Sequence, residues 1–275
     1  MGNSSKDKAA KDAKVDSKGN SSSGKKGKES TVICDNMNFA AKEAYKRLRT
    51  NIIFSFPNEG KCRVVGVTSP QPGEGKTVTA INLTYSLSEL GKKVLFVDAD
   101  MRRSSVGRKL NITSTPGLSN LLVNMADISS VISKYTSPSG VSFDIIPGGD
   151  VPPNPAELLG SERMSNLIDV LGGVYDYIIV DLPPVCAVVD AMAVSANLDG
   201  IIVVIREQHT PKNAIAYTIE QLKFSGVKIL GLVVNGTLEG TGKKYSYKKY
   251  VYGYGKRRNG YYGYYSGGYY SNGYY

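Results

Sequence analysis

Five runs of Val, Ile and Leu in the middle of this chain restrict what it can fold into. They lack the alternation of polar and apolar side chains that a strand with one solvated face shows. The runs are RVVGVT at 63–68, KVLFV at 93–97, YIIV at 177–180, IIVVI at 201–205 and ILGLVV at 229–234. Strands of this type are buried on both faces, which indicates a parallel sheet with helices on either side.

Helical patterns lie between these runs. Apolar residues that recur every four positions predict a helix over 38–54. Further helices are expected over 77–90, 155–171 and 211–224, with one more short strand at 143–146. We therefore predict an α/β fold in three layers, in which helices cover both faces of a doubly wound, mainly parallel sheet. Ligands of such folds bind at the carboxyl ends of the strands.

The positive charge of the chain, formally +10, is concentrated at its two ends. Residues 1–31 are rich in Lys and Ser and predict a disordered leader. Residues 243–275 carry seven basic residues and no acidic one, and predict a disordered tail that is rich in tyrosine. The globular domain expected between them, 32–242, is close to neutral. This distribution argues against a basic groove for nucleic acid on the folded domain.

The remaining composition excludes several classes of protein. Three widely spaced cysteines, without any CxxC pair, predict neither a disulfide framework nor a zinc site and are typical of a reducing compartment. No apolar run approaches the roughly 18 residues of a membrane-spanning helix, and the first residues lack the apolar stretch of a signal peptide. We therefore expect a cytoplasmic chain.

A phosphate-binding loop follows the first predicted strand and opens the next helix. Its sequence is SPQPGEGKT at 69–77, where Pro70 replaces the first glycine of the strict GxxxxGK[ST] pattern. Glycines allow backbone N–H groups to turn toward phosphate oxygens, a lysine reaches the β- and γ-phosphates, and a threonine hydroxyl binds Mg²⁺. The predicted phosphate-binding residues are Gly73, Glu74, Gly75, Lys76, Thr77 and Val78.

Carboxylates end two of the predicted strands. KVLFV runs into Asp98 and Asp100, and YIIV runs into Asp181. An aspartate at the end of an apolar strand beside a phosphate loop is the Walker B arrangement, which holds Mg²⁺. The sequence thus predicts a site for ATP with Mg²⁺, and we expect the metal at Thr77, Asp98 and Asp181. Asp98 is favoured as the base and Asp100 as a metal contact, although these two roles could be exchanged.

The motifs PGEGKT, VLFVDADMR and IIVDLPP, followed by a tyrosine cluster, resemble those of the bacterial tyrosine kinases that govern capsular and exopolysaccharide synthesis. The resemblance implies a P-loop NTPase fold of the MinD/ParA type, with Lys76, Asp98 and Asp100 as the catalytic residues. It implies autophosphorylation in trans of the tyrosine tail. The expected acceptors are Tyr261, Tyr262, Tyr264, Tyr265, Tyr269, Tyr270, Tyr274 and Tyr275.

The same resemblance implies partners. Glu43, Lys46 and Arg49 match the ExxRxxR motif of the family's ring-forming helix, with lysine at its middle position. We expect a homo-oligomeric ring and a transmembrane activator of the chain-length-determinant type, which recruits the kinase to the inner face of the membrane. A cognate tyrosine phosphatase is also expected, and no nucleic acid.

Two other classes of function stay open. One is an ATPase switch of the MinD/ParA type without kinase activity. Gln71 argues against it, because those ATPases place a signature lysine there. The other is a binding module whose tail contacts RNA or polysaccharide through its tyrosines. At the end of the last predicted strand, Asn235 is expected either to contact the nucleotide base or to cap a turn.

Overall fold

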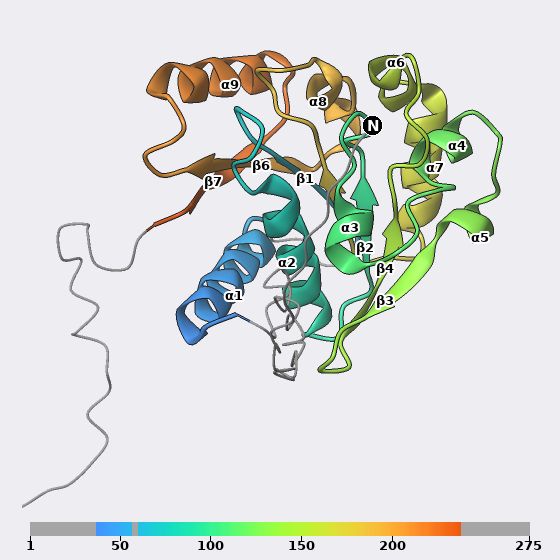
Figure 1. Cartoon of the computed structure of the whole chain (residues 1–275), viewed down its shortest axis with the longest axis horizontal. Coiled ribbons are helices and arrows are strands. Elements are labelled where there is room, and N and C mark those ends of the chain that lie inside the picture. Colours follow the sequence, from blue (N-terminus) through green and yellow to red (C-terminus); the bar gives the residue numbers. More distant parts are fainter. Residues whose placement is uncertain (1–36, 57–59, 238–275) are drawn as a thin grey trace, which may run out of the picture. The chain divides into compact units, whose positions relative to one another are not determined.

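The computed structural model describes residues 37–56 and 60–237 (Figure 1). The chain divides into one unit that ends at Gly236 and a second that begins at Thr237, and the fold below is that of the first unit. The predicted leader and the whole of the predicted tail, with its tyrosine acceptors, lie outside the described residues. The predicted domain boundaries at 31 and 242 lie outside them as well and stay predictions.

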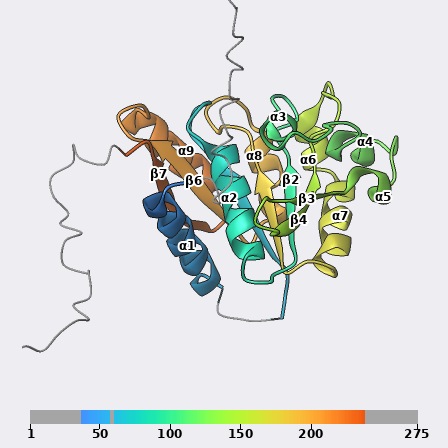
Figure 2. The ribbon, with the colours of Figure 1, turned by 60° about the horizontal axis from the view of Figure 1, so that its bottom comes forward.

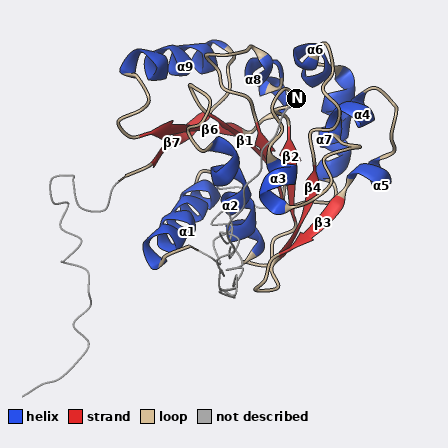
Figure 3. Cartoon of the chain, in the orientation of Figure 1, coloured by secondary structure: helices blue, strands red, loops and turns tan. Residues whose placement is uncertain are grey.

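Seven strands form one sheet in the order β3-β4-β2-β5-β1-β6-β7 (Figure 3). All neighbouring strands are parallel except β3, which pairs antiparallel with β4 at one edge. The strands are β1 (Arg63–Thr68), β2 (Val94–Asp98), β3 (Ser133–Thr136), β4 (Ser142–Ile146), β5 (Tyr177–Asp181), β6 (Gly200–Arg206) and β7 (Ile229–Asn235). The buried strands β1, β2, β5 and β6 are the apolar runs of the sequence, which confirms the predicted mainly parallel α/β fold.

Helices cover both faces of the sheet (Figures 1 and 2). On one face, apolar residues of three helices pack against the sheet: α1 (Phe39–Phe54), α2 (Lys76–Ser88) and α3 (Val106–Leu110). The opposite face is covered by α4 (Leu118–Leu122), α5 (Ile128–Val131), α6 (Pro155–Leu159), α7 (Glu162–Gly172), α8 (Asp190–Ala193) and α9 (Lys212–Phe224), with a 3₁₀ turn at Ser195–Asn197. The three predicted layers are therefore present.

One predicted element is wrong. The single helix expected over 155–171 is two helices, α6 and α7, which are separated at Gly160 and Ser161. Gly160 ends α6, and the hydroxyl of Ser161 accepts a hydrogen bond from the backbone N–H of Met164, so that this serine caps the start of α7. The capping contact stabilises a new helix start, which spacing of apolar residues alone does not reveal.

The register of the central strands determines where the site forms. Asp98 at the end of β2 lies directly beside Asp181 at the end of β5, and Val67 of β1 lies on the other side of Asp181. The phosphate-binding loop leaves β1 one residue later, after Thr68. The loop and both strand-end carboxylates therefore meet at the carboxyl edge of the sheet, as the sequence predicts.

Candidate active site

The loop between β1 and α2 has the backbone of a phosphate cradle. Gly73 and Gly75 have φ of 82° and 96°, in the left-handed region that favours glycine. A Cβ atom at Gly73 would meet nothing within 4 Å, whereas a Cβ at Gly75 would lie 2.4 Å from the amide nitrogen of Asn235. Gly75 precedes the first residue of α2, so this helix directs its N-terminal N–H groups and its positive dipole end at the loop.

Glu74 lies in the loop, but its side chain is buried, with 1% of the residue exposed, and does not line the pocket. Its carboxylate accepts one hydrogen bond from the backbone N–H of Gln71 and a second from the hydroxyl of Thr210. The Thr210 hydroxyl in turn accepts from the backbone N–H of Arg206 at 2.8 Å. This chain of contacts connects the phosphate-binding loop to the segment that follows β6.

Asn235, the last residue of β7, also binds the loop. Its side-chain amide donates to the carbonyl of Glu74 at 3.0 Å and to the hydroxyl of Thr79 at 3.3 Å. The sequence left its role open between contact with a base and a turn. In this structure the amide joins the end of β7 to the phosphate-binding loop and the start of α2.

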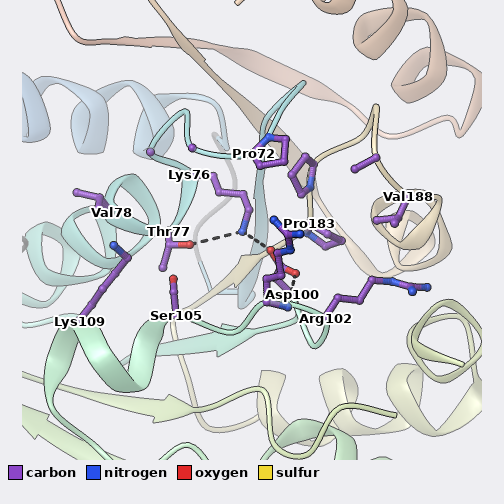
Figure 4. Close-up of a pocket in the computed structure, with 15 residues that line it drawn as sticks. Pro72, Lys76, Thr77, Val78, Asp100, Arg102, Ser105, Lys109, Pro183 and Val188 are labelled. Carbon is purple, nitrogen blue, oxygen red and sulfur yellow. Dashed lines mark hydrogen bonds and ion pairs between the residues drawn. The ribbon is translucent and has the colours of Figure 1, made fainter. Parts of the chain in front are cut away.

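A lysine and two carboxylates meet above the end of the sheet, and Figure 4 shows the lysine, Lys76, beside one of them, Asp100. Lys76 Nζ lies 2.8 Å from the carboxylate of Asp100 and 3.4 Å from that of Asp181. The hydroxyl of Thr77 donates to Asp181 at 2.6 Å. All four residues are buried or nearly so, and water therefore screens their charges little.

Asp98 has a different environment from Asp100. It is fully buried, and its two carboxylate oxygens accept hydrogen bonds from the backbone N–H of Asp100 at 3.1 Å and from the hydroxyl of Ser104 at 2.8 Å. Asp100 lines the pocket, while Asp98 does not. The structure thus brings Lys76, Thr77 and all three predicted aspartates together, but only one carboxylate of the DAD motif faces the open space.

The three carboxylates and one lysine leave the cluster short of positive charge. Burial, together with the nearby carboxylate of Asp181, raises the pKa of Asp98 to about 7. Burial also raises the pKa of Asp181, against the opposing effect of Lys76. For Lys76, burial alone would lower the pKa, but the carboxylates of Asp181 and Asp100 outweigh it, so its pKa is raised and the amine stays charged. A bound cation would relieve this excess of negative charge.

The donor set fits Mg²⁺ held together with nucleotide phosphates. Hydroxyl and carboxylate oxygens from Thr77 and Asp181 are hard ligands of the kind that Mg²⁺ prefers. Within residues 37–56 and 60–237, no group of three or more His, Cys, Asp or Glu side chains forms a complete metal site. Mg²⁺ is usually held by one or two carboxylates plus substrate phosphates and waters, so the arrangement agrees with this mode of binding.

A pocket of about 680 Å³ opens onto this cluster, within the size range of small-molecule sites. Besides the loop, Lys76, Thr77, Val78 and Asp100, it is lined by residues that sequence reasoning did not place there. They are Arg102, Arg103, Ser105, Lys109, Pro183, Pro184, Ala187 and Val188. Arg102 and Arg103 lie just after the DAD motif, and Pro183 and Pro184 belong to the DLPP motif. Closeness to these two motifs was the only signal in the sequence that could have found them.

The residues that match the ring-forming motif lie on α1, apart from the pocket. Lys46 is exposed and Glu43 is partly exposed, and the two form an ion pair at 2.9 Å. Arg49 is bound within the chain, because its guanidinium donates to the carbonyl of Ser86 on α2 at 2.6 Å and to Glu89, which follows that helix, at 2.9 Å. In this structure, Arg49 therefore attaches α1 to α2, while Glu43 and Lys46 face outward.

Comparisons with known proteins agree with this geometry. The family model described as an AAA domain matches residues 62–227. Tyrosine-protein kinase CpsD of Streptococcus agalactiae is 34% identical over 209 residues, which cover 76% of this chain and 89% of that protein. Tyrosine-protein kinase YwqD of Bacillus subtilis (strain 168) is 35% identical over 205 residues, with coverage of 74% and 85%.

Solved structures give the same result. The kinase domain of the Escherichia coli tyrosine kinase ETK matches with a TM-score of 0.68 and 32% identity, over 74% of this chain and 79% of that one. The chimerical protein CapA2B2 matches with a TM-score of 0.65 and 33% identity, over 70% and 83%. A cobyrinic acid a,c-diamide synthase from Mycobacterium smegmatis, solved with ADP and magnesium, shares only the fold, at 18% identity and a TM-score of 0.53. No helix among the described residues is long and apolar enough to cross a membrane.

Proposed function

Since the chain belongs to the family of bacterial tyrosine kinases, we propose that it transfers the γ-phosphoryl group of ATP to tyrosines in the tail of a neighbouring copy. The observation that supports this most is the convergence of Lys76, Thr77, Asp100 and Asp181 on one pocket at the end of the sheet. Thirteen tyrosines within residues 245–275 supply acceptors on the same chain.

The loop and the start of α2 hold the nucleotide in this proposal. Backbone N–H groups around Gly73 and Gly75 bind phosphate oxygens, and the neighbouring Val78 lines the same end of the pocket. Lys76 would leave Asp100 and move to the phosphates, because they carry more negative charge than the Asp100 carboxylate. Thr77 and Asp181 would hold Mg²⁺, with Asp98 in the buried layer behind them. When bound, the metal supplies neutralisation of the charge that develops on the phosphates.

Phosphoryl transfer then requires mainly positioning. The phenol oxygen bonds to the γ-phosphorus as the bond from that phosphorus to the β–γ bridging oxygen breaks, so ADP leaves and the phenol proton passes to a carboxylate. We assign this base role to Asp100, because Asp100 lines the pocket and nucleotide binding frees it from Lys76. Asp98, with both oxygens occupied by Ser104 and the Asp100 N–H, shapes the loop that carries the base.

The assembly in which this reaction occurs belongs to the same proposal. Glu43 and Lys46 lie at the surface of α1 and would contact a neighbouring copy in a ring, together with Arg49 of the same helix. Similarity to the chimerical protein CapA2B2 supports a CapA-type membrane activator as partner, which would recruit the kinase to the inner face of the membrane for capsule or exopolysaccharide synthesis. A tyrosine phosphatase would reset the tail.

Charge offers a mechanism for regulation of the assembly. Residues 243–275 have seven basic and no acidic residues, and each phosphotyrosine adds nearly two negative charges. Several phosphotyrosines would reverse the charge of this segment and weaken its docking at the carboxylates of a neighbouring site. Phosphorylation is thereby expected to release copies from one another.

Mass spectrometry tests the proposed activity. The full chain is incubated with Mg-ATP, with and without a peptide that copies the cytoplasmic tail of the activator, and phosphotyrosine is mapped. The Lys76→Met variant is the matched control. Phosphotyrosine within residues 245–275 of the unaltered chain, absent from the variant, supports the proposal. ATP hydrolysis that depends on Lys76 without any phosphotyrosine would instead indicate a MinD/ParA-type ATPase switch.

A further inference from the structure

A run of apolar residues lies exposed at the rim of the pocket, just before α8. Ala187 is exposed, Val188 is half-buried and Val189 is 63% exposed. Single exposed apolar residues are common on protein surfaces, but these lie together beside a polar site, where a bound molecule can cover them. The two residues at the base of this run, Pro183 and Pro184, are buried and line the pocket below it.

This run is part of the pocket that contains the charged cluster. Pro183, Pro184, Ala187 and Val188, here called the apolar wall, line the same cavity as Lys76 and Asp100. Figure 4 shows Val188 on one side of the pocket, Val78 and Lys109 on the other, and Lys76 with Asp100 between them. The side near Val78 is the start of α2, where the phosphates are proposed to bind. The apolar wall therefore lies beyond the reacting groups, on the side away from the start of that helix.

An ion pair fixes the wall relative to Asp100. The guanidinium of Arg102 donates to both carboxylate oxygens of Asp190, through Nε at 2.8 Å and Nη2 at 3.3 Å. Asp190 is the first residue of α8 and is 1% exposed, whereas Arg102 lies two residues after Asp100. A two-point contact of this kind restricts both distance and orientation. It joins the loop that carries Asp100 to the helix that follows the apolar wall.

We propose that the apolar wall binds the ring of the acceptor tyrosine and points its hydroxyl toward Asp100, with Arg102 and Asp190 as positioning residues. The inference rests on the proposed kinase function and adds the acceptor subsite to it. A phenol has an apolar body and a polar tip, and it matches a surface of proline and valine that ends at a carboxylate. A serine or threonine side chain is too short to lie on the wall and present its hydroxyl at the same point.

The charge and sequence of the tail agree with this occupant. The segment GYYGYY at 260–265 places glycines beside pairs of tyrosines, so the main chain can approach the rim closely. Its tyrosines are flanked by no acidic residue that would repel the carboxylates of the site.

The test separates acceptor binding from nucleotide binding. Val188→Asp and Ala187→Asp are made in the full chain, and kinetics are measured with a synthetic peptide of residues 259–270 as acceptor. We expect the peptide KM to rise at least 10-fold in both variants, while the affinity for a fluorescent ADP analogue changes less than 2-fold. Val170→Asp is the control for the added charge, because Val170 is an exposed valine (65%) on α7 that does not line the pocket.

Arg102→Ala tests the positioning contact. It is expected to lower kcat for the peptide about 10-fold with little change in ADP affinity, and Arg102→Lys should restore only part of the loss because it lacks the planar fork. An unchanged peptide KM in a folded Val188→Asp variant overturns the proposal. So does a parallel loss of ADP affinity, which would place the wall in the nucleotide site, or a loss of self-association alone, which would make it a subunit contact. A failure of the kinase function itself would appear separately, as absence of peptide phosphorylation by the unaltered chain.

Discussion

Replacement of Thr210 by valine tests whether the segment after β6 holds the phosphate-binding loop in shape. The Thr210 hydroxyl donates to the buried carboxylate of Glu74 and accepts from the backbone N–H of Arg206. Valine has nearly the same shape but no hydroxyl. In the variant, Glu74 keeps only its hydrogen bond from the Gln71 N–H and remains buried with one oxygen unpaired.

The magnitude follows from that unpaired oxygen. A hydrogen bond to a charged group contributes about 1.5–3 kcal/mol, and loss of one partner leaves the other desolvated. Arg206 is exposed, so water can replace the acceptor of its N–H at little cost. We therefore expect the free energy of unfolding to fall by about 2 kcal/mol, which lowers Tm by roughly 4–8 °C for a domain of about 200 residues. Because the loop loses a constraint, affinity for a fluorescent ADP analogue should fall severalfold.

Thermal unfolding and ADP titration of the two variants measure both effects. Thr210→Ser is the matched control, since it keeps the hydroxyl and removes only a methyl group. The expected order of stability is unaltered chain, then Thr210→Ser close to it, then Thr210→Val well below. The reasoning is refuted if the free energies of unfolding of the Thr210→Val and Thr210→Ser variants differ by less than about 0.5 kcal/mol and the two variants bind ADP equally. The contact with Glu74 would then not hold the loop.

Three further predictions follow from the same geometry. Gly75→Ala should weaken ADP binding at least 10-fold, because the φ of 96° at this position is strained for alanine and the new Cβ would lie 2.4 Å from the amide nitrogen of Asn235. ADP titration measures the loss of affinity, and a near-normal affinity would contradict the prediction. Burial raises the pKa of Asp98 to about 7, so as pH rises this carboxyl ionises in the unfolded chain before it does in the folded one. The stability of the ligand-free protein should therefore fall between about pH 4 and 7. Asp98→Asn should flatten that dependence in unfolding curves and be more stable than the unaltered chain at pH 8, and an unchanged pH profile would show that this carboxyl is not responsible. Phosphorylated protein should sediment as smaller species than unphosphorylated protein, and equal sedimentation would argue against release by charge reversal.

The sequence was sufficient to predict the frame of the site. The apolar strands and the aspartates that end two of them are local patterns, and parallel pairing necessarily brings their carboxyl ends to one edge. Lys76, Thr77, Asp98, Asp100 and Asp181 therefore meet as predicted. The helices over 38–54 and 211–224 were also placed within a residue of their observed ends, because their apolar spacing and caps are local features.

Other contacts depend on residues that are distant in the sequence, and no local pattern contains them. The contacts of Glu74 with Thr210, of Asn235 with the loop and of Arg102 with Asp190 join elements that are 88 or more residues apart. The difference between Asp98 and Asp100 is of the same kind, since Ser104 and the depth of burial decide which carboxylate faces the pocket. Strand β3 was missed because SKYT has the half-exposed pattern of an edge strand and no apolar run.

The proposal that phosphate passes between copies can be measured directly by mixing two full-length variants. One is Lys76→Met, which keeps its tail tyrosines but lacks the phosphate-binding lysine. The other has Lys76 but carries phenylalanine at all thirteen tyrosines of residues 245–275. Neither should gain tail phosphotyrosine alone with Mg-ATP and the activator peptide, whereas the mixture should label the tail of the Lys76→Met chain. A mixture that stays unlabelled, while the unaltered chain labels its own tail, would contradict transfer in trans.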